Sequence, residues 1–483
     1  MNEDEARRAL GQIFALRFPR SWESLDLERF PIANYIIFRD ALDPTFEASR
    51  DRIKDARARL SDRGIEPLFM MDEEGGRVTQ ISSFFPSAPS PRAVARVLRP
   101  DEAADLYAQL GAYLRQLGID INLAPCIDVN TEGLNPIIGT RSFGADTSTV
   151  TMFGGAAIRS LRRSIACVAK HFPGHGMTRH DSHVSLPVVD APRETLQSVH
   201  MAPFKDAIKW CADGIMVSHC LYRALEACDL PASLSTHVVR GHLRLNLRYD
   251  GLVLTDSLDM RSVTQNFAPP TAALQAYDAS CDILLYTQMS EGFESAFGSL
   301  LDMLLMGKLN RDHLAKSIAR RKRIFERSAL TAEFKPLFDA GIYGHLAEAV
   351  RAGCVRIDDP RGVLPLKSSG ISVLSTSSDV VDKIRARVSD VAEIGNRRED
   401  VAGPAGRTLL MWLCEPLTVR YSLDALRSMI RAADRSAIVT SYDAVAKCLA
   451  DCDVKVVTDD LSPLTEDAIV DRLFPASPAL ARD

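Results

Sequence analysis

Residues 164–172 read SIACVAKHF, an apolar run that carries a lysine and a histidine near its end. A run of this length without polar alternation is typical of a strand that is buried on both faces of a parallel sheet. Seven similar runs precede residue 290: GQIFALRF from residue 11, NYIIFRD from 34, EPLFMMDEE from 66, DINLAPCIDV from 120, DGIMVSH from 213, GLVLTD from 251 and CDILLY from 281. The sequence therefore predicts eight strands.

Longer helical patterns separate these runs. In DEAADLYAQLGAYLRQL, residues 101–117, apolar side chains recur every three to four positions, and a glycine leads into the next run. Such alternation of strands and helices predicts an α/β fold, a (β/α)8 barrel of the TIM type. A doubly wound open sheet is the structural alternative, but no GxGxxG loop follows any of the runs.

A second, smaller α/β domain is expected after the barrel. The basic segment DHLAKSIARRKRIFER at residues 312–327 ends the first pattern. Beyond it, ISVLSTSS from residue 371, TLLMWLC from 408, SAIVTSY from 436 and VKVVTD from 454 are typical of strands with helices between them. We expect the barrel to occupy residues 1–335 and the small domain residues 350–483.

The composition excludes several classes of protein. Hydrophobic residues make up 46% and charged residues 25% of the 483-residue chain, as in ordinary globular proteins. A net charge of -5 gives no basic surplus, so nucleic acid is not an expected partner. No run reaches the roughly 18 apolar residues of a membrane span. The first residues, MNEDEARRAL, lack the pattern of a secretory signal, so we expect a cytoplasmic protein.

The ten cysteines are scattered from Cys126 to Cys452 without a CxxC pair. This arrangement favours reduced, buried thiols over a disulfide framework or a structural zinc site. The sequence gives no indication of the oligomeric state, and it predicts no cofactor.

Reactive side chains stand at or just after the ends of the predicted strands. They are Arg39, Asp72, Asp128, Lys170, His171, His219 and Asp256. Because the carboxyl ends of barrel strands meet at one face, we expect these groups to converge on an active site. In MDEEGGRVTQI, Asp72 and Arg77 offer bidentate hydrogen bonding beside two glycines, and Arg141 lies in the glycine-containing segment NPIIGTRSFG. With His219, these residues are candidates for binding the substrate.

The segment KHFPGHGMTRHDSHVSLPVVD, residues 170–190, is the richest in reactive groups. Its four histidines could bind a metal, but Pro173 and Gly174 break the helix that an HxxxH pair needs. We therefore predict no metal site. Asp181 and His183 are separated by one residue, which places both side chains on the same side of an extended segment. A carboxylate beside an imidazole is the arrangement that a general acid/base requires.

Asp256 is the second catalytic candidate. In GLVLTDSLDM it ends an apolar strand, where a barrel delivers a carboxylate into its central pocket as a nucleophile. We expect Ser257 to cap the following helix and Asp259 to lie in the first turn of that helix.

On these residues the chain resembles glycoside hydrolase family 3, in its bacterial β-N-acetylglucosaminidase (β-hexosaminidase) branch. Matching segments extend over nearly all of residues 10–330: GQIFALRF, MDEEGGRV, LAPCIDV, NPIIGTRSFG, KHFPGHG followed by DSH, MVSH, and LPASLS before GLVLTDSLDM. The combination of KHFPGHG with a downstream DSH is the most specific, because other branches lack DSH and take their acid from a glutamate elsewhere.

The resemblance implies a retaining exo-hydrolase that removes terminal β-linked N-acetylglucosamine from muropeptides during cell-wall recycling. Asp256 would attack the anomeric carbon, while His183, oriented by Asp181, would protonate the leaving oxygen and then deprotonate water. The sugar-binding residues that it implies are Asp72, Arg141, Lys170 and His171. Some members of this branch accept phosphate in place of water.

Two residues depart from the family pattern. Met177 stands where an aspartate usually follows KHFPGHG, and Gln80 stands where many bacterial members have an arginine. GVLPLK at residues 362–367 resembles the start of the family's second domain, which is expected to be shortened here. Two alternatives stay open: a β-glucosidase or β-xylosidase of the same family, and a catalytically silent sugar-binding protein on the same barrel.

Overall fold

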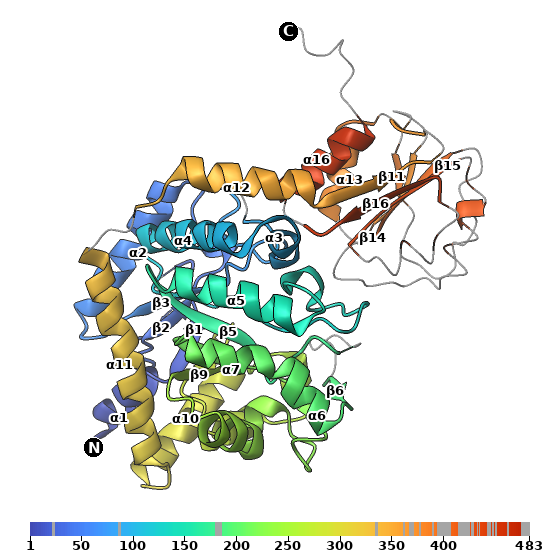
Figure 1. Cartoon of the computed structure of the whole chain (residues 1–483). Coiled ribbons are helices and arrows are strands. Elements are labelled where there is room, and N and C mark those ends of the chain that lie inside the picture. The colour runs from blue at the N-terminus through green and yellow to red at the C-terminus, as the bar shows by residue number, and fades with distance from the viewer. Residues whose placement is uncertain are drawn as a thin grey trace.

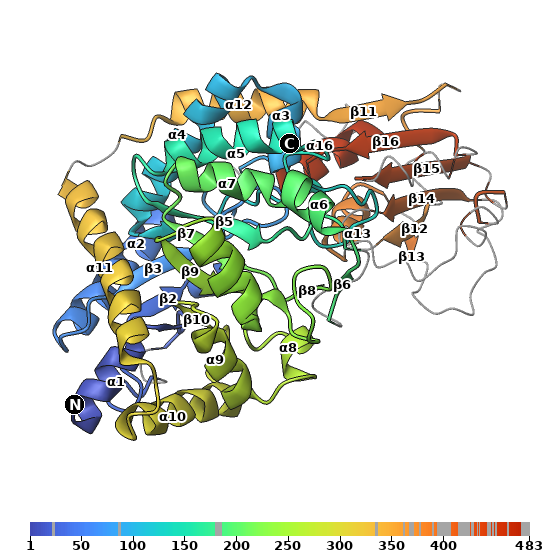
Figure 2. The same ribbon diagram turned by 60° about the horizontal axis from the view of Figure 1, so that its bottom comes forward.

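The computed structural model contains two α/β units (Figures 1 and 2). It describes residues 1–474 except 22–24, 86–87, 179–185, 334–336, 361–362, 367–370, 376–377, 389–390, 394–406, 414–425, 427–428, 432, 434, 442–445, 447–448, 450–451 and 461–462. No helix within this described part is both long and apolar enough to cross a membrane.

Eight parallel strands form the barrel. They are β1 (Phe14–Arg17), β2 (Asn34–Ile36), β3 (Leu68–Met71), β4 (Ile121–Asn122), β5 (Ala166–Phe172), β7 (Gly214–Val217), β9 (Leu252–Thr255) and β10 (Leu284–Leu285). Their order is β10-β1-β2-β3-β4-β5-β7-β9, and a parallel bridge between Leu254 and Ile283 joins β9 to β10. Each strand lies within a predicted run, so the barrel is confirmed and the open sheet is excluded.

The strands are apolar on both faces because each face is buried. In β3, Leu68 and Met70 belong to the cluster inside the barrel, whereas Phe69 and Met71 pack with the surrounding helices. Alternate side chains of a strand point to opposite faces, so an uninterrupted apolar run serves both layers.

Helices surround the barrel (Figure 1). The main ones are α2 (Phe46–Ser61), α4 (Pro100–Leu117), α5 (Thr147–Leu161), α7 (Ala202–Lys209), the π-helix η6 (His237–Asn246), α9 (Pro269–Asp278) and α10 (Glu291–Leu305). The predicted amphipathic helix is α4, and Gly118, with a φ of 103°, ends it. The regular alternation fails once, since the described residues between β1 and β2 contain no helix. Pro19 and Pro31 lie at the two ends of that link, and proline cannot continue helical hydrogen bonding.

Helix α11 (Arg311–Glu333) lies at the end of the barrel where the strands begin, away from the second unit (Figure 1). Its polar side chains bond to residues at the starts of four strands: Arg321 to Asn34, Ser328 to Asp120, Arg327 to Asp213 and Arg320 to Asp282. Arg321 is fully buried, and its Nε donates to Asn34 Oδ1 at 2.8 Å. Several arginines of the basic segment at residues 312–327 are thus paired with polar residues of the barrel.

The second unit contains one mixed sheet, in the order β11-β16-β15-β14-β12-β13. Its strands are β11 (Val355–Asp358), β12 (Ile371–Ser375), β13 (Val391–Glu393), β14 (Thr408–Leu413), β15 (Arg435–Thr440) and β16 (Val454–Thr458), with helices α13 (Ser378–Arg385) and α16 (Pro463–Leu473). The four predicted strands are confirmed, and the edge strands β11 and β13 were not predicted. The expected domain limits, residues 1–335 and 350–483, remain a prediction.

The two units meet beside helix α3 (Pro91–Val97). The backbone N–H of Ser90 donates to Asp460 Oδ1 at 2.9 Å, and Arg96 forms an ion pair with Asp459 at 2.5 Å. Helix α12 (Ala340–Gly353), which leads into the second sheet, contacts α3 and α4. These contacts hold the second unit against the barrel.

Candidate active site

A cavity of about 360 Å³ opens at the end of the barrel where the strands finish. Its polar lining consists of Asp72, Glu74, Arg77, Arg141, Lys170, His171, His175, Asp256, Ser257 and Thr287. Its apolar lining consists of Ile36, Phe38, Val78, Ile137, Met216, Met260 and Leu285. All of these residues belong to the barrel. The volume lies within the range of small-molecule sites, roughly 300–1,000 Å³.

A buried group of charges forms one wall of the cavity. Lys170 Nζ lies 2.5 Å from Glu74 Oε1 and forms a second ion pair with Asp72. Arg141 binds Glu74 with two parallel bonds, from Nε at 2.7 Å and from Nη2 at 2.8 Å. Burial alone would raise the pKa of Glu74, but the charges of Arg141 and Lys170 lower that pKa far below its usual range. Glu74 therefore stays ionised between the two cations.

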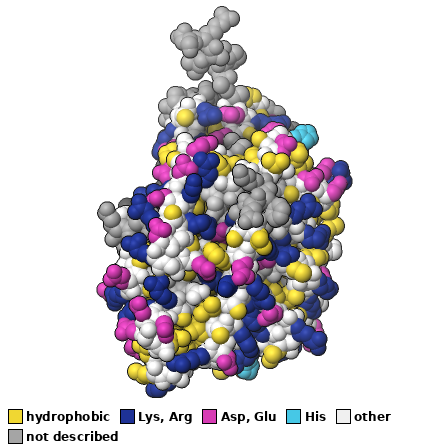
Figure 3. Space-filling view, turned by 90° about the vertical axis from the view of Figure 1, so that its left-hand side faces the viewer, with side chains coloured by type: hydrophobic (Ala, Val, Ile, Leu, Met, Phe, Trp, Pro, Cys, Tyr) yellow, Lys and Arg dark blue, Asp and Glu magenta, His cyan; other side chains and the backbone are white. Residues whose placement is uncertain are grey.

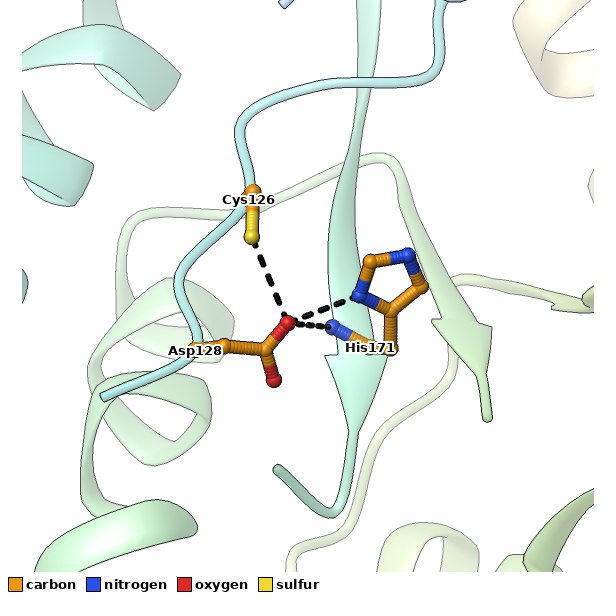
Figure 4. A group of neighbouring side chains, drawn as sticks. All are labelled: Cys126, Asp128 and His171. Carbon is orange, nitrogen blue, oxygen red and sulfur yellow. Dashed lines mark hydrogen bonds and ion pairs between the residues drawn. The ribbon is translucent and has the colours of Figure 1, made fainter. Parts of the chain in front are cut away.

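Asp128 holds the ring of His171 (Figure 4). The carboxylate lies 2.7 Å from His171 Nδ1 and accepts the backbone N–H groups of His171 at 3.1 Å and His175 at 2.6 Å. Burial alone would raise the pKa of Asp128, but His171 and His175 lower it to about 2. Arg141 Nη2 lies 3.2 Å from His171 Nε2. Because a guanidinium can only donate, Nε2 accepts and the ring proton is on Nδ1, facing Asp128.

Cys126, Asp128 and His171 have ligand atoms within 4.8 Å of one another, a spacing that a metal ion can bridge. In the structure these atoms bond to each other instead: Cys126 Sγ donates to Asp128 at 3.3 Å, beside the bond from His171 (Figure 4). Burial raises the pKa of Cys126 well above its ordinary value, which favours the thiol over the metal-binding thiolate. This donor set fits a hydrogen-bonded support for His171 better than a metal centre.

Asp256 follows β9 directly and lines the cavity. Its Oδ1 accepts the backbone N–H of Ser257 at 2.8 Å. Burial alone would raise the pKa of Asp256, but His219, His171 and Lys170 bring it below its ordinary value. At neutral pH the cavity therefore contains an ionised carboxylate at this position.

His219 lies behind the cavity wall. Its Nδ1 is 2.7 Å from Ser233 Oγ and its Nε2 is 2.9 Å from the backbone oxygen of Ser257. Both ring nitrogens therefore have protein partners, and His219 is not among the residues that line the cavity. This geometry fits support of the segment after Asp256 better than contact with a ligand.

Gln80 and Glu73 hold the segment around Asp72. Gln80 Nε2 donates to the backbone oxygen of Asp72 at 3.2 Å, and its Oε1 accepts the backbone N–H of Arg39 at 3.0 Å. Glu73 Oε2 accepts the backbone N–H of Gln80 at 2.7 Å and the hydroxyl of Thr79 at 3.1 Å. Burial raises the pKa of Glu73 to about 7. Gln80 thus links Asp72 to Arg39. The sequence showed only that a glutamine replaces the usual arginine at this position, not that it makes these bonds.

The structure brings most of the predicted site residues into one cavity: Asp72, Arg77, Arg141, Lys170, His171 and Asp256. Asp181 and His183 lie outside the described residues. Glu74 was missed, although its position two residues after Asp72 at a strand end was a usable signal. Met177, which the sequence left unexplained, is partly buried against the main hydrophobic core.

One local prediction was wrong. Ser257 does not cap a helix and Asp259 is not in a first helical turn, because α8 (Arg261–Thr264) begins later. Asp259 instead accepts the backbone N–H of Thr287 at 2.8 Å and that of Gln288 at 3.0 Å. Since Thr287 follows β10, this carboxylate ties the ends of β9 and β10 together.

Comparison with known proteins identifies the family and supports the fold. Residues 10–324 match the model of the glycosyl hydrolase family 3 N-terminal domain, and this range includes every residue that lines the cavity. The chain belongs to glycosyl hydrolase family 3. The resemblance inferred from KHFPGHG and DSH is thereby confirmed at the level of the family.

Similar family 3 proteins carry the name beta-hexosaminidase. One from Pseudoalteromonas piscicida, beta-hexosaminidase A, is 30% identical over 372 residues, which are 71% of this chain and 62% of that relative. Another, from Idiomarina loihiensis, is 31% identical over 261 residues, or 53% of this chain and 76% of the relative. The chain thus spans less than two thirds of the first relative's length.

Solved family 3 structures share the two-unit fold. A β-N-acetylglucosaminidase from Paenibacillus sp. str. FPU-7 has a TM-score of 0.81 and 24% identity, and the match covers 97% of this chain and 96% of that one. Because the match includes both units, it confirms the predicted barrel with a second α/β domain. The two curated relatives are named as beta-hexosaminidases, and the solved structure supports the fold.

Proposed function

We propose that this chain is a retaining exo-β-N-acetylglucosaminidase that removes a terminal β-linked N-acetylglucosamine from peptidoglycan-derived muropeptides. The observation that carries the proposal is the placement of the ionised Asp256 in one small cavity with the Lys170, Asp72 and Arg141 charges. A carboxylate nucleophile beside fixed hydroxyl-binding groups is what displacement at an anomeric carbon requires. The names of the relatives support the acetamido sugar.

The proposed reaction has two displacement steps. An oxygen of Asp256 attacks the anomeric carbon, the bond to the aglycone oxygen breaks, and His183 gives that oxygen a proton. Water then attacks the glycosyl-enzyme, His183 takes the proton of the water, and Asp256 is released. Asp181 would orient His183 throughout. The roles of Asp181 and His183 rest on the family resemblance.

The charged wall is proposed to hold the terminal sugar. Lys170 has three N–H groups, and its ion pairs with Asp72 and Glu74 leave one for a sugar hydroxyl. Asp72 accepts hydroxyl protons, while Arg141 and His171 are held in place by Glu74 and Asp128. His219 is proposed to act by positioning the backbone beside Asp256 rather than by binding sugar.

The test is turnover of p-nitrophenyl β-N-acetylglucosaminide and of the β-glucoside by the native protein, Asp256→Ala and His183→Ala. We expect turnover of the first substrate only, and a loss of at least about 10³-fold in Asp256→Ala, because the covalent step is removed. Preference for the glucoside would contradict the acetamido specificity and support the β-glucosidase alternative. No turnover of either substrate would support the silent sugar-binding alternative.

Three finer parts of the proposal have their own tests. Proton NMR of the first product tests retention, which requires the β-anomer to form initially. Release of N-acetylglucosamine from a defined muropeptide tests the aglycone, and its absence would contradict the recycling role. The cytoplasmic location stays a prediction, which fractionation of cells that express the protein would check.

A further inference from the structure

A second cavity, of about 550 Å³, lies at the opposite end of the barrel. It is bounded by η6, by the first turns of α11, and by the turns that precede β9 and β10. Five cationic side chains line it: Arg240, Arg244, Arg248, Lys316 and Arg320. Two carboxylates, Asp250 and Asp312, share the lining.

Part of this charge is already neutralised. Arg320 bonds to Asp250 at 2.7 Å and to the buried Asp282 at 3.0 Å, and Arg244 pairs with Asp282 as well. Asp250 also pairs with Arg323 at 3.4 Å. Asp250 and Asp282 are therefore already paired, and neither carboxylate neutralises Arg248 or Lys316.

Two cations of the lining have no ion-pair partner among the residues that the structure describes. The side chains of Arg248 and Lys316 form no hydrogen bond or ion pair with any residue that the structure describes, and both residues are exposed. Arg240 donates to the hydroxyl of Ser280 at 3.1 Å and to the backbone oxygen of Asp278 at 2.7 Å, and its charge offsets part of the rise that burial causes in the pKa of Asp278. With Asp312 as the other carboxylate of the lining, the cavity keeps a net positive charge that comes mainly from Arg248 and Lys316.

Arg244 is a nearly buried member of the lining. Its side chain is only 8% exposed, yet its Nε has no hydrogen-bond partner among the described residues. This donor is closed off from solvent, so Arg244 contributes its charge to the lining rather than a free N–H group.

We propose that this cavity binds a small phosphorylated molecule through its phosphate group. Phosphate oxygens match several converging arginine and lysine donors in number and charge. A volume of about 550 Å³ is in the range of small-molecule sites. The site is separate from the proposed active site, since the four residues of β9, spanning about 13 Å, lie between Asp250 and Asp256.

The surroundings disfavour nucleic acid or an anionic membrane as the occupant. The chain has a net charge of -5, and Figure 3, which looks onto this end of the molecule, shows basic side chains interspersed with acidic ones. Long polyanions bind through extended, unbroken basic surfaces. A pocket-sized ligand needs only the local excess around Arg248 and Lys316.

The test is isothermal titration of the full chain with inorganic pyrophosphate at constant ionic strength. We expect saturable binding that falls about tenfold or more in Arg248→Ala and in Lys316→Ala, because each loses a charged hydrogen bond. Lys316→Arg should retain most of the affinity. Lys54→Ala, which removes an exposed cation from α2, is the matched control and should bind as the native protein does.

Binding at the active site is distinguished by Lys170→Ala, which alters only the other cavity. Retained affinity in Lys170→Ala together with loss in Arg248→Ala supports the proposal. No saturable binding by the native protein, equal losses in Lys54→Ala and Arg248→Ala, or loss confined to Lys170→Ala would overturn it. Arg248 and Lys316 are exposed and unpaired within the described chain, so both variants should fold, which melting curves will verify.

Discussion

His171 Nδ1 lies 2.7 Å from the carboxylate of Asp128, and the opposite ring nitrogen accepts from Arg141 at 3.2 Å. One imidazole therefore connects a buried aspartate to the charged wall of the cavity. Arg141 in turn binds Glu74, which binds Lys170. The position of each sugar-binding candidate thus depends on its neighbour. The buried carboxylates of Asp128 and Glu74 hold these neighbours in place.

Asp128→Asn should lower the free energy of unfolding by about 3 kcal/mol at pH 7, because a buried acceptor of three N–H groups becomes partly a donor. The pKa of Asp128 is about 2, below its ordinary 3.8, so its ionisation stabilises the fold above pH 3.8. About 2 kcal/mol of stability should be lost as pH falls through 2. Urea unfolding measures both effects. An Asp128→Asn variant as stable as the exposed control Asp62→Asn would contradict this account.

Glu74→Gln should destabilise the protein by about 3–5 kcal/mol, because Lys170 and Arg141 would lose the anion between them. Turnover should fall as well, since both cations would shift. Thermal unfolding and kcat/KM are the measurements, with the exposed Glu28→Gln as the control. If Glu74→Gln melts at the same temperature as the control, the ion pairs do not hold the wall together.

Glu73→Gln should stabilise the protein at pH 8 by up to about 3 kcal/mol. Burial raises the pKa of Glu73 from 4.5 to about 7, so the folded state disfavours the charged form. Stability of the native protein should therefore decline as pH rises from 4.5 through 7, and the neutral amide removes this decline. Urea midpoints at pH 5 and pH 8 test it, and an equal gain at both values would contradict the role of ionisation.

Gln80→Ala should reduce kcat/KM about tenfold with little loss of stability, because two bonds that fix Asp72 relative to Arg39 disappear. The effect should be mainly on KM, since Asp72 is proposed to bind a sugar hydroxyl. Steady-state kinetics with the β-N-acetylglucosaminide measure this split. Unchanged KM with reduced stability would assign Gln80 a purely structural role.

The barrel could be predicted because its strands are buried on both faces, which leaves continuous apolar runs such as GLVLTD. The ends of elements were harder to place. Ser257 and Asp259 are residue types that favour a helix start. Asp259 instead accepts a hydrogen bond from the backbone N–H of Thr287, after β10. A bond between residues 28 apart in sequence overrode the local preference.

The sequence could predict those site residues that stand at the ends of strands. Asp72, Lys170 and Asp256 were recoverable because barrel geometry delivers such positions to one face. The sequence could not show that Glu74 joins Lys170 to Arg141, because those residues lie far from it in the chain. Nor could it show that His219 lies behind the wall, since a change of one position reverses the direction of a side chain along a strand.

The pairing of α11 with the strand starts bears on how the protein is made. Arg320, Arg321 and Arg327 complete the base of the barrel from the last helix of that unit. During vectorial synthesis the aspartates at the strand starts pair first with arginines of earlier helices, such as Arg115, Arg162 and Arg244, and gain their α11 partners only when this helix leaves the ribosome. At roughly 5–20 residues per second, translation of the residues after α11 takes on the order of ten seconds or more. The barrel can close within that interval, before the second sheet is complete.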